Sequence, residues 1–66
     1  MKKINFAINL KYARRAKGFT QDKLAQILNV DQTTISAWEK GVCEPSLDML
    51  AKLCDILDES FDSLLS

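Results

Sequence analysis

The sequence predicts an all-α fold, with five short helices packed as one compact domain over residues 1–66. Apolar residues recur at spacings of three and four along most of the chain, as in amphipathic helices, and no segment alternates like a strand. Residues that commonly cap or end helices separate these apolar segments. A chain of 66 residues has room for one domain and buries about 60% of its unfolded surface, so each core position matters.

The first helix is expected over residues 5–17. Its narrow apolar stripe consists of Phe6, Leu10 and Ala13. These residues are spaced i, i+4 and i+7, which places them on one face of a helix. Gly18 stands where glycine commonly ends a helix, and Phe19 is expected to fill the corner that follows.

The next stretch predicts a helix over residues 21–28, a tight corner and a helix over residues 32–40. Thr20 can accept a hydrogen bond from a free backbone N–H at the start of the first of these helices. Asn29 follows that helix, and asparagine tolerates the left-handed conformation that helix ends often need. Asp31 is expected to cap the second helix.

A fourth helix is expected over residues 47–57, with Ser46 as its cap. Its main apolar stripe is Leu47, Leu50, Ala51, Cys54 and Leu57, widened by Met49, Leu53 and Ile56. This stripe should close the core over the first three helices, with Cys54 acting as a small apolar residue.

The last helix is expected over residues 61–65, with Ser60 as its cap. Phe61, Leu64 and Leu65 are more apolar surface than so short a terminal helix should leave in water. We expect Leu64 to point into the core, and Phe61 or Leu65 to lie partly toward a partner molecule.

The charges divide along the chain. Residues 1–40 contain eight basic and three acidic residues, whereas residues 41–66 contain one basic and six acidic residues, and the formal net charge is zero. This asymmetry favours a basic face for an anionic partner and an acidic end held away from it, with scattered solvated charge as the alternative. Lys2 and Lys3 could extend the basic face as a short arm, although such termini are more often frayed.

The composition disfavours several classes of protein. There is no apolar run near about 18 residues and no signal peptide, so we expect no membrane span and a cytoplasmic location. Cys43 and Cys54, in a sequence without histidine, are too few for a disulfide framework or a zinc site. No nucleophile stands with a base or a metal set, so we expect no enzyme, and neither a metal, a cofactor nor a small-molecule ligand.

The helix over residues 32–40 has one face of small, polar or basic side chains. That face consists of Gln32, Thr33, Ser36, Ala37 and Lys40. Short hydrogen-bonding side chains without an acid among them are what a reader of the DNA major groove needs. An ordinary amphipathic helix in a small bundle is the alternative interpretation of the same pattern.

A set of residues in the middle of the chain stands in the register of a known motif. The set is Gln21, Leu24, Ala25, Leu28, Val30, Ile35, Trp38, Glu39, Gly41 and Pro45. With these residues the chain resembles the helix-turn-helix domain of lambdoid phage repressors and Cro proteins, the XRE family, over about residues 10–65. The resemblance implies a five-helix lambda-repressor-like fold with the motif at 20–41. Asn29 replaces the family's usual turn glycine, and Asp58 and Glu59 stand where it has glycine and an aliphatic residue.

The resemblance implies a small, repressor-type transcriptional regulator that binds double-stranded DNA as a homodimer on a two-fold operator. The implied homodimer forms through the C-terminal helices. The implied base contacts are Gln32, Thr33, Ser36 and Ala37, and the implied phosphate contacts are Thr20, Gln21, Thr34 and Lys40. The implied dimer interface contains Phe61 and Leu65, and Arg14 and Glu39 form a structural ion pair. In such proteins Gln21 lies beside Gln32 and can orient it. The alternatives are a protein-interaction module or an antitoxin-type autoregulator that retains the fold.

Overall fold

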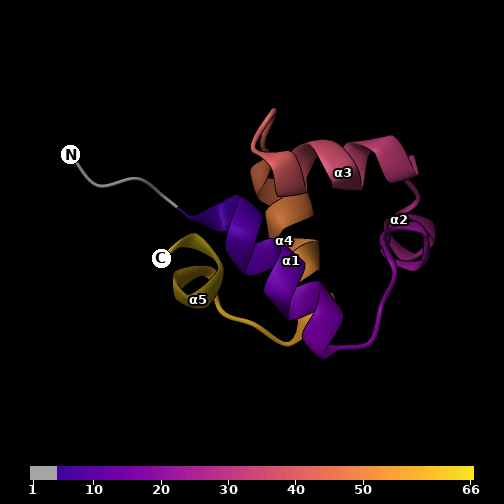
Figure 1. Cartoon of the computed structure of the whole chain (residues 1–66). Coiled ribbons are helices and arrows are strands. Elements are labelled where there is room, and N and C mark those ends of the chain that lie inside the picture. Colours follow the sequence, from indigo (N-terminus) through magenta and orange to yellow (C-terminus); the bar gives the residue numbers. More distant parts are fainter. Residues whose placement is uncertain (1–4) are drawn as a thin grey trace.

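The computed structural model describes residues 5–66, which form five helices joined by short turns (Figure 1). The helices are α1 (Phe6–Ala16), α2 (Gln21–Leu28), α3 (Gln32–Lys40), α4 (Leu47–Leu57) and α5 (Phe61–Leu65). The predicted all-α fold is confirmed, and the expected bounds hold for every helix except α1, which is one residue shorter at each end. The proposed basic arm of Lys2 and Lys3 lies outside the described residues.

The first helix organises the fold. It packs against both α3 and α5, while α2 packs against α3 and α4 packs against α5. Figure 1 shows the result: α4 passes behind α1, and α2 and α5 lie at opposite ends of the molecule. The helix-turn-helix pair therefore occupies one end of the molecule and the short C-terminal helix the other.

Every helix contributes a fully buried side chain to one core. These side chains are Leu10, Leu24, Ile35, Leu53, Leu57 and Leu64. Truncating such a residue to alanine typically costs about 2–5 kcal/mol, a large share of the stability of so small a domain. Phe19 and Val30 pack against the core from the corners, as the sequence predicts, and the inward position of Leu64 is confirmed.

The buried face of α4 differs from the expected one. Leu50, Leu53 and Leu57 face the core, whereas Leu47 is 78% exposed and Ala51 is exposed too. Apolar residues surround most of this helix, so their spacing alone cannot tell which flank packs inward. Cys54 lies at the edge of the core and is half-buried.

Four helices in residues 5–66 end with the same backbone turn. The residue with positive φ is Gly18 (80°), Asn29 (59°), Gly41 (76°) or Asp58 (58°). The N–H of the next residue donates to the carbonyl five positions earlier: Phe19 to Arg14 (3.1 Å), Val30 to Ala25 (3.0 Å), Val42 to Ala37 (3.0 Å) and Glu59 to Cys54 (2.9 Å). This bond satisfies a carbonyl that the helix end leaves free. Aspartate tolerates the left-handed region, so the turn forms without the glycine that the family usually has there.

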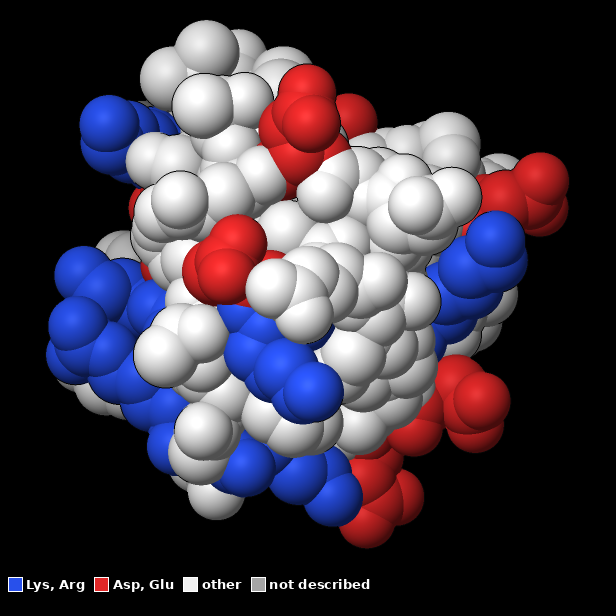
Figure 2. Space-filling model, turned by 90° about the vertical axis from the view of Figure 1, so that its right-hand side faces the viewer, with Lys and Arg blue, Asp and Glu red and all other residues white. Residues whose placement is uncertain are grey.

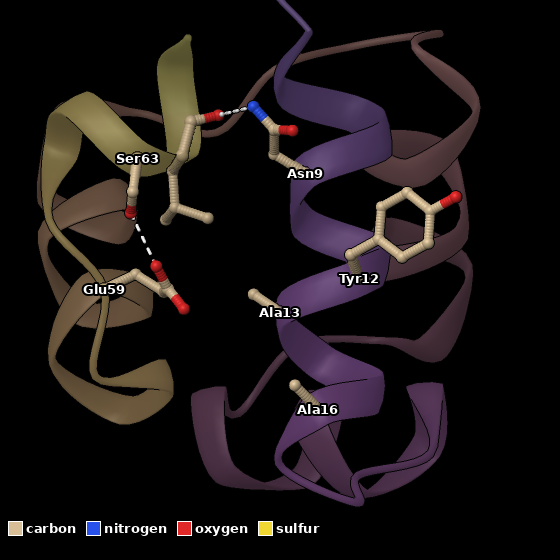
Figure 3. Close-up of a pocket in the computed structure, with 7 residues that line it drawn as sticks. Asn9, Tyr12, Ala13, Ala16, Glu59 and Ser63 are labelled. Atoms are coloured by element: carbon tan, nitrogen blue, oxygen red, sulfur yellow. Dashed lines mark hydrogen bonds between the residues drawn. The ribbon is translucent and has the colours of Figure 1, made fainter.

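The last helix is fixed to α1 although it is short (Figure 3). Asn9 Nδ2 on α1 donates to the carbonyl oxygen of Leu64 at 3.0 Å. The Ser63 N–H donates to Ser60 Oγ at 3.0 Å, which caps α5, and Ser63 Oγ donates to Glu59 Oε1 at 2.6 Å. The Asn9 bond ties α5 to α1, the two serine bonds close the start of α5, and Phe61 is left 45% exposed.

Candidate nucleic-acid interface

The α2–α3 corner is closed by small and aliphatic side chains. Ala25 is 2% exposed, and Ile35 on α3 is fully buried. The small side chain at position 25 lets α2 and α3, which pack against each other, come close together. Thr20 Oγ1 accepts a hydrogen bond from the Lys23 N–H at 3.0 Å, so its expected cap is present. The two helices therefore form a closely packed pair, with one face of α3 left in water.

A buried ion pair ties this unit to α1. Arg14 Nε lies 2.6 Å from Glu39 Oε2, and Arg14 Nη2 donates to Glu39 Oε1 at 3.1 Å. The two side chains are only 8% and 4% exposed. Arg14 Nη1 also donates to the carbonyl oxygen of Phe19 at 2.7 Å. The structure thus contains the pair that the resemblance implies, in a bidentate geometry that fixes α3 relative to α1.

Two glutamines continue this network to the surface. Gln21 Nε2 donates to Glu39 Oε1 at 3.0 Å, and Gln21 Oε1 accepts from Gln32 Nε2 at 3.2 Å. The chain of bonds runs from a buried guanidinium to an exposed amide at the start of α3. Because an amide nitrogen carries two hydrogens, Gln32 keeps one N–H and its Oε1 for a ligand while the other N–H is held by Gln21.

The predicted base-contact residues share one region of α3. Gln32 and Thr33 are exposed, and Ser36 and Ala37 are half-buried. Among the predicted phosphate contacts, Thr20 and Lys40 are exposed, while Gln21 and Thr34 are half-buried. A hollow of about 220 Å³ lies on this face, lined by Thr33, Ser36, Ala37, Lys40 and Val42.

Asp31 does not cap α3 in the way the sequence predicts. It occupies the capping position, with φ −74° and ψ 149°, but its side chain makes no capping hydrogen bond. The first turn is closed instead by the backbone, where the Thr34 N–H donates to the Asp31 carbonyl at 3.0 Å. The side chain is exposed, so water can solvate the carboxylate in place of the helix N–H groups.

The charges on the end that carries α2 are uneven (Figure 2). Lys and Arg gather over the lower left of this view, with further basic groups at the upper left and the right edge, whereas Asp and Glu are spread over the top, the centre and the right. A neutral chain therefore still presents a basic region, as its charge pattern along the sequence suggests.

The C-terminal end exposes apolar groups in an acidic setting. Phe61 is 45% exposed and Leu65 is half-buried. Phe61 lines a hollow together with Ala51, Cys54, Asp55, Asp58, Glu59 and Ser60. Burial, with a smaller contribution from the Glu59 carboxylate, raises the pKa of the Cys54 thiol above its ordinary value.

Val42 lines the hollow on the candidate interface, although the sequence analysis did not include it. It follows α3, is 75% exposed and lines the same hollow as Ala37. The signal was present in the sequence, because a residue that follows a helix-ending glycine commonly contacts the last turn of the helix. Gly41 marks that position here.

Residues 5–66 contain neither a metal-ion cluster nor a membrane-spanning helix. No cluster of three or more His, Cys, Asp or Glu side chains suited to a metal ion occurs there. In the same part of the chain, no helix is long and apolar enough to cross a bilayer.

The sequence and the fold agree with one family. The profile of the helix-turn-helix family HTH_3 matches residues 10–64. The chain is 38% identical, over 60 residues, to the SPbeta prophage-derived HTH-type transcriptional regulator YonR of Bacillus subtilis strain 168, and the match covers 91% of this chain and 56% of YonR. The chain therefore spans about half the length of the first relatives that it matches, at 56% and 52%.

Solved structures share this fold over most of the chain or all of it. A transcriptional regulator from Listeria innocua superposes with a TM-score of 0.89 at 26% identity, over 97% of this chain and 60% of that one. The restriction-modification controller protein C.AhdI from Aeromonas hydrophila superposes with a TM-score of 0.82 at 31% identity, over 92% of both chains. The iron-containing protein Fe(II)-HppE also matches, with a TM-score of 0.87 at 29% identity, but the match covers only 35% of its chain. With the profile match and this fold, the chain belongs to the XRE family of helix-turn-helix proteins.

Proposed function

We propose that this protein is a sequence-specific transcriptional regulator that binds double-stranded DNA with α3 in the major groove. The observation that carries the proposal is the hydrogen-bonded chain from Arg14 through Glu39 and Gln21 to Gln32. It fixes an exposed amide relative to the core before any ligand binds, and such preorganisation lowers the entropy lost on binding. In helix-turn-helix proteins the second helix of the motif reads bases while the first crosses the backbone.

Four residues of α3 supply the base contacts in this proposal. Gln32 can pair bidentately with adenine N6 and N7, through its free N–H and Oε1. Thr33 and Ser36 can donate or accept, and Ala37 offers an apolar contact. With Gln32 as the one long reader among these four, specificity leans partly on the shape and flexibility of the DNA.

The start of α2 supplies the main phosphate contacts. Backbone N–H groups at Gln21 and the positive end of the helix dipole favour an anion there, with the Thr20 hydroxyl beside them. Thr34 and Lys40 extend these contacts along α3. Asp22 stands on the same turn, but its carboxylate accepts a hydrogen bond from Gln26 at 3.0 Å along the helix.

Dimerisation through α5 completes the proposal. One α3 reads only a few base pairs, so two copies on a two-fold operator are needed, with half-site centres about 10 bp apart. Phe61, 45% exposed, and Leu65 provide apolar surface for a second copy. Neighbouring carboxylates at Asp55, Asp58 and Glu59 keep this surface away from phosphate. Occupying an operator in this way would block transcription, as a repressor does.

Selection from a random pool of double-stranded DNA tests the proposal directly. We expect one enriched two-fold sequence, and an affinity for it that falls steeply as salt rises. Lys40→Gln should remove one phosphate contact and so reduce the slope of log affinity against log salt concentration by about 1. The control is Lys52→Gln, which changes an exposed lysine on α4 and should leave the slope unchanged. Absence of binding at low salt, or binding that ignores salt, would instead support a protein-interaction module.

A further inference from the structure

The four helix ends that share a backbone turn differ in how exposed the residue after the left-handed position is. At α1, α2 and α4 the residue after the left-handed position is half-buried: Phe19, Val30 and Glu59. At α3 the equivalent residue, Val42, is 75% exposed. An apolar residue at this position normally contacts the last turn of its own helix, and often the core as well. Val42 therefore has an apolar side chain in water at a place where the fold elsewhere covers it.

The backbone turn decides where this side chain lies. Gly41 has φ 76°, and the Val42 N–H donates to the Ala37 carbonyl at 3.0 Å. In this motif the two residues joined by that bond also make the accompanying hydrophobic contact. Val42 thus adds an apolar side chain, beyond the end of α3, to the face of the helix that carries the predicted base contacts. It lies next to Ala37, which is one of those contacts.

The hollow around these two residues has a distinct chemistry. Its volume is about 220 Å³, and its other lining residues are Thr33, Ser36 and Lys40. Its apolar groups come from Val42, Ala37 and the methyl group of Thr33. Lys40 supplies a basic side chain, and none of the described residues that line the hollow is acidic. An apolar hollow with a basic edge, continuous with the proposed base-reading face, fits a small apolar group presented beside a phosphate backbone.

We infer that Val42 and Ala37 form a receptor for the C5-methyl group of a thymine in the major groove. This inference rests on the proposed function. Thymine is the base that offers a methyl group in that groove, and apolar side chains recognise it. Each buried methyl contributes about fourfold in affinity. Val42 therefore determines specificity at one thymine per half-site, in addition to the base contacts from α3 itself.

A uracil scan tests the inference on the operator that the selection yields. Each thymine is replaced in turn by deoxyuridine, which removes only the C5-methyl group, and the dissociation constant is measured by fluorescence anisotropy. We expect one position per half-site at which uracil lowers the affinity of the unaltered protein about fourfold. Val42→Ala should bind the thymine operator about fourfold more weakly and lose its sensitivity to uracil at that position alone. The exposed residue Ile8 on α1 provides a matched control, because Ile8→Ala should keep the whole uracil profile.

The possible outcomes separate the inference from the proposed function. If the selected operator binds and Val42→Ala shows the same uracil profile as the unaltered protein, the inference is overturned and DNA binding stands. If the pool yields no enriched sequence, the proposed function fails first and the inference falls with it. An unchanged melting temperature in Val42→Ala shows that a change in affinity does not come from unfolding.

Discussion

The α2–α3 corner and the α4–α5 corner begin from nearly the same backbone. Asn29 and Asp58 have φ 59° and 58°, and the residue after each donates to a carbonyl five positions earlier. Beyond that turn the two corners diverge. The first is braced by the Arg14–Glu39 ion pair and two glutamines, while the second exposes Phe61 among carboxylates.

The difference shows that the turn sets only the angle between two helices. What each corner can bind depends on the side chains around it. A polar network that leads from the core to an exposed amide suits hydrogen bonding to bases. An exposed aromatic side chain offers apolar surface to a second copy of the chain, and the carboxylates around it disfavour nucleic acid. In the proposed function, the same local structure therefore serves two kinds of partner at opposite ends of a small fold.

The largest effect is expected where the first corner is braced. Arg14→Met leaves Glu39, 4% exposed, as a buried charge without its partner. Breaking a buried pair in this way costs about 3–5 kcal/mol of stability, measured by urea unfolding. Arg15→Met is the matched control, because Arg15 is the next residue on α1 and is exposed, so its change should stay within about 0.5 kcal/mol.

A double variant sharpens this test. Arg14→Met combined with Glu39→Met removes both charges, so most of the lost stability should return. DNA affinity should stay low, because Gln21 has lost the acceptor that positions it beside Gln32. If Arg14→Met alone were as stable as Arg15→Met, the ion pair would not brace the corner.

The next effect concerns the second corner. Phe61→Glu places a charge in the proposed dimer surface and should weaken self-association by about 2 kcal/mol, roughly 30-fold, by sedimentation equilibrium. Thermal stability at low concentration should change little, because Phe61 is 45% exposed. Ile27→Glu is the control, since Ile27 is 42% exposed and lies on α2, at the opposite end of the molecule from α5. Equal weakening in both variants, or in neither, would remove α5 as the dimer surface.

A smaller effect should be the same at both corners. Alanine has no side-chain group to ease the left-handed conformation, so Asn29→Ala and Asp58→Ala should each cost about 1 kcal/mol in thermal unfolding. Asn29→Gly and Asp58→Gly should restore that stability, because glycine adopts positive φ freely. A loss at only one of the two positions would show that the shared turn does not carry the same strain.

The sequence predicted the parts of this fold that depend on local signals. Thr20, Gly18 and Asn29 mark helix ends by chemistry that acts within a few residues, and the helix bounds follow from them. The buried flank of α4 was missed because it is set by which neighbours pack against it, and Leu47 fits either side by pattern. The Arg14–Glu39 pair and the Gln21–Gln32 contact join residues far apart in the chain, so only the family resemblance pointed to them. Val42 was missed although Gly41 marks its place in the sequence, because the exposure of its side chain depends on how the turn and its neighbours pack.

The smallest expected effect is a dependence of stability on pH that arises at the second corner. The pKa of the Cys54 thiol at the second corner is raised in the folded protein, first by burial and then by Glu59, from an ordinary value of 9.0. The unfolded thiol therefore loses its proton at a lower pH than the folded one, so stability is full below about pH 9 and declines as the pH rises through the raised pKa. Unfolding by urea across this range, in a Cys43→Ala background so that one thiol titrates, should show this decline. Cys54→Ala should remove it and Glu59→Gln should reduce it, and an equal decline in all three proteins would place the titrating group elsewhere.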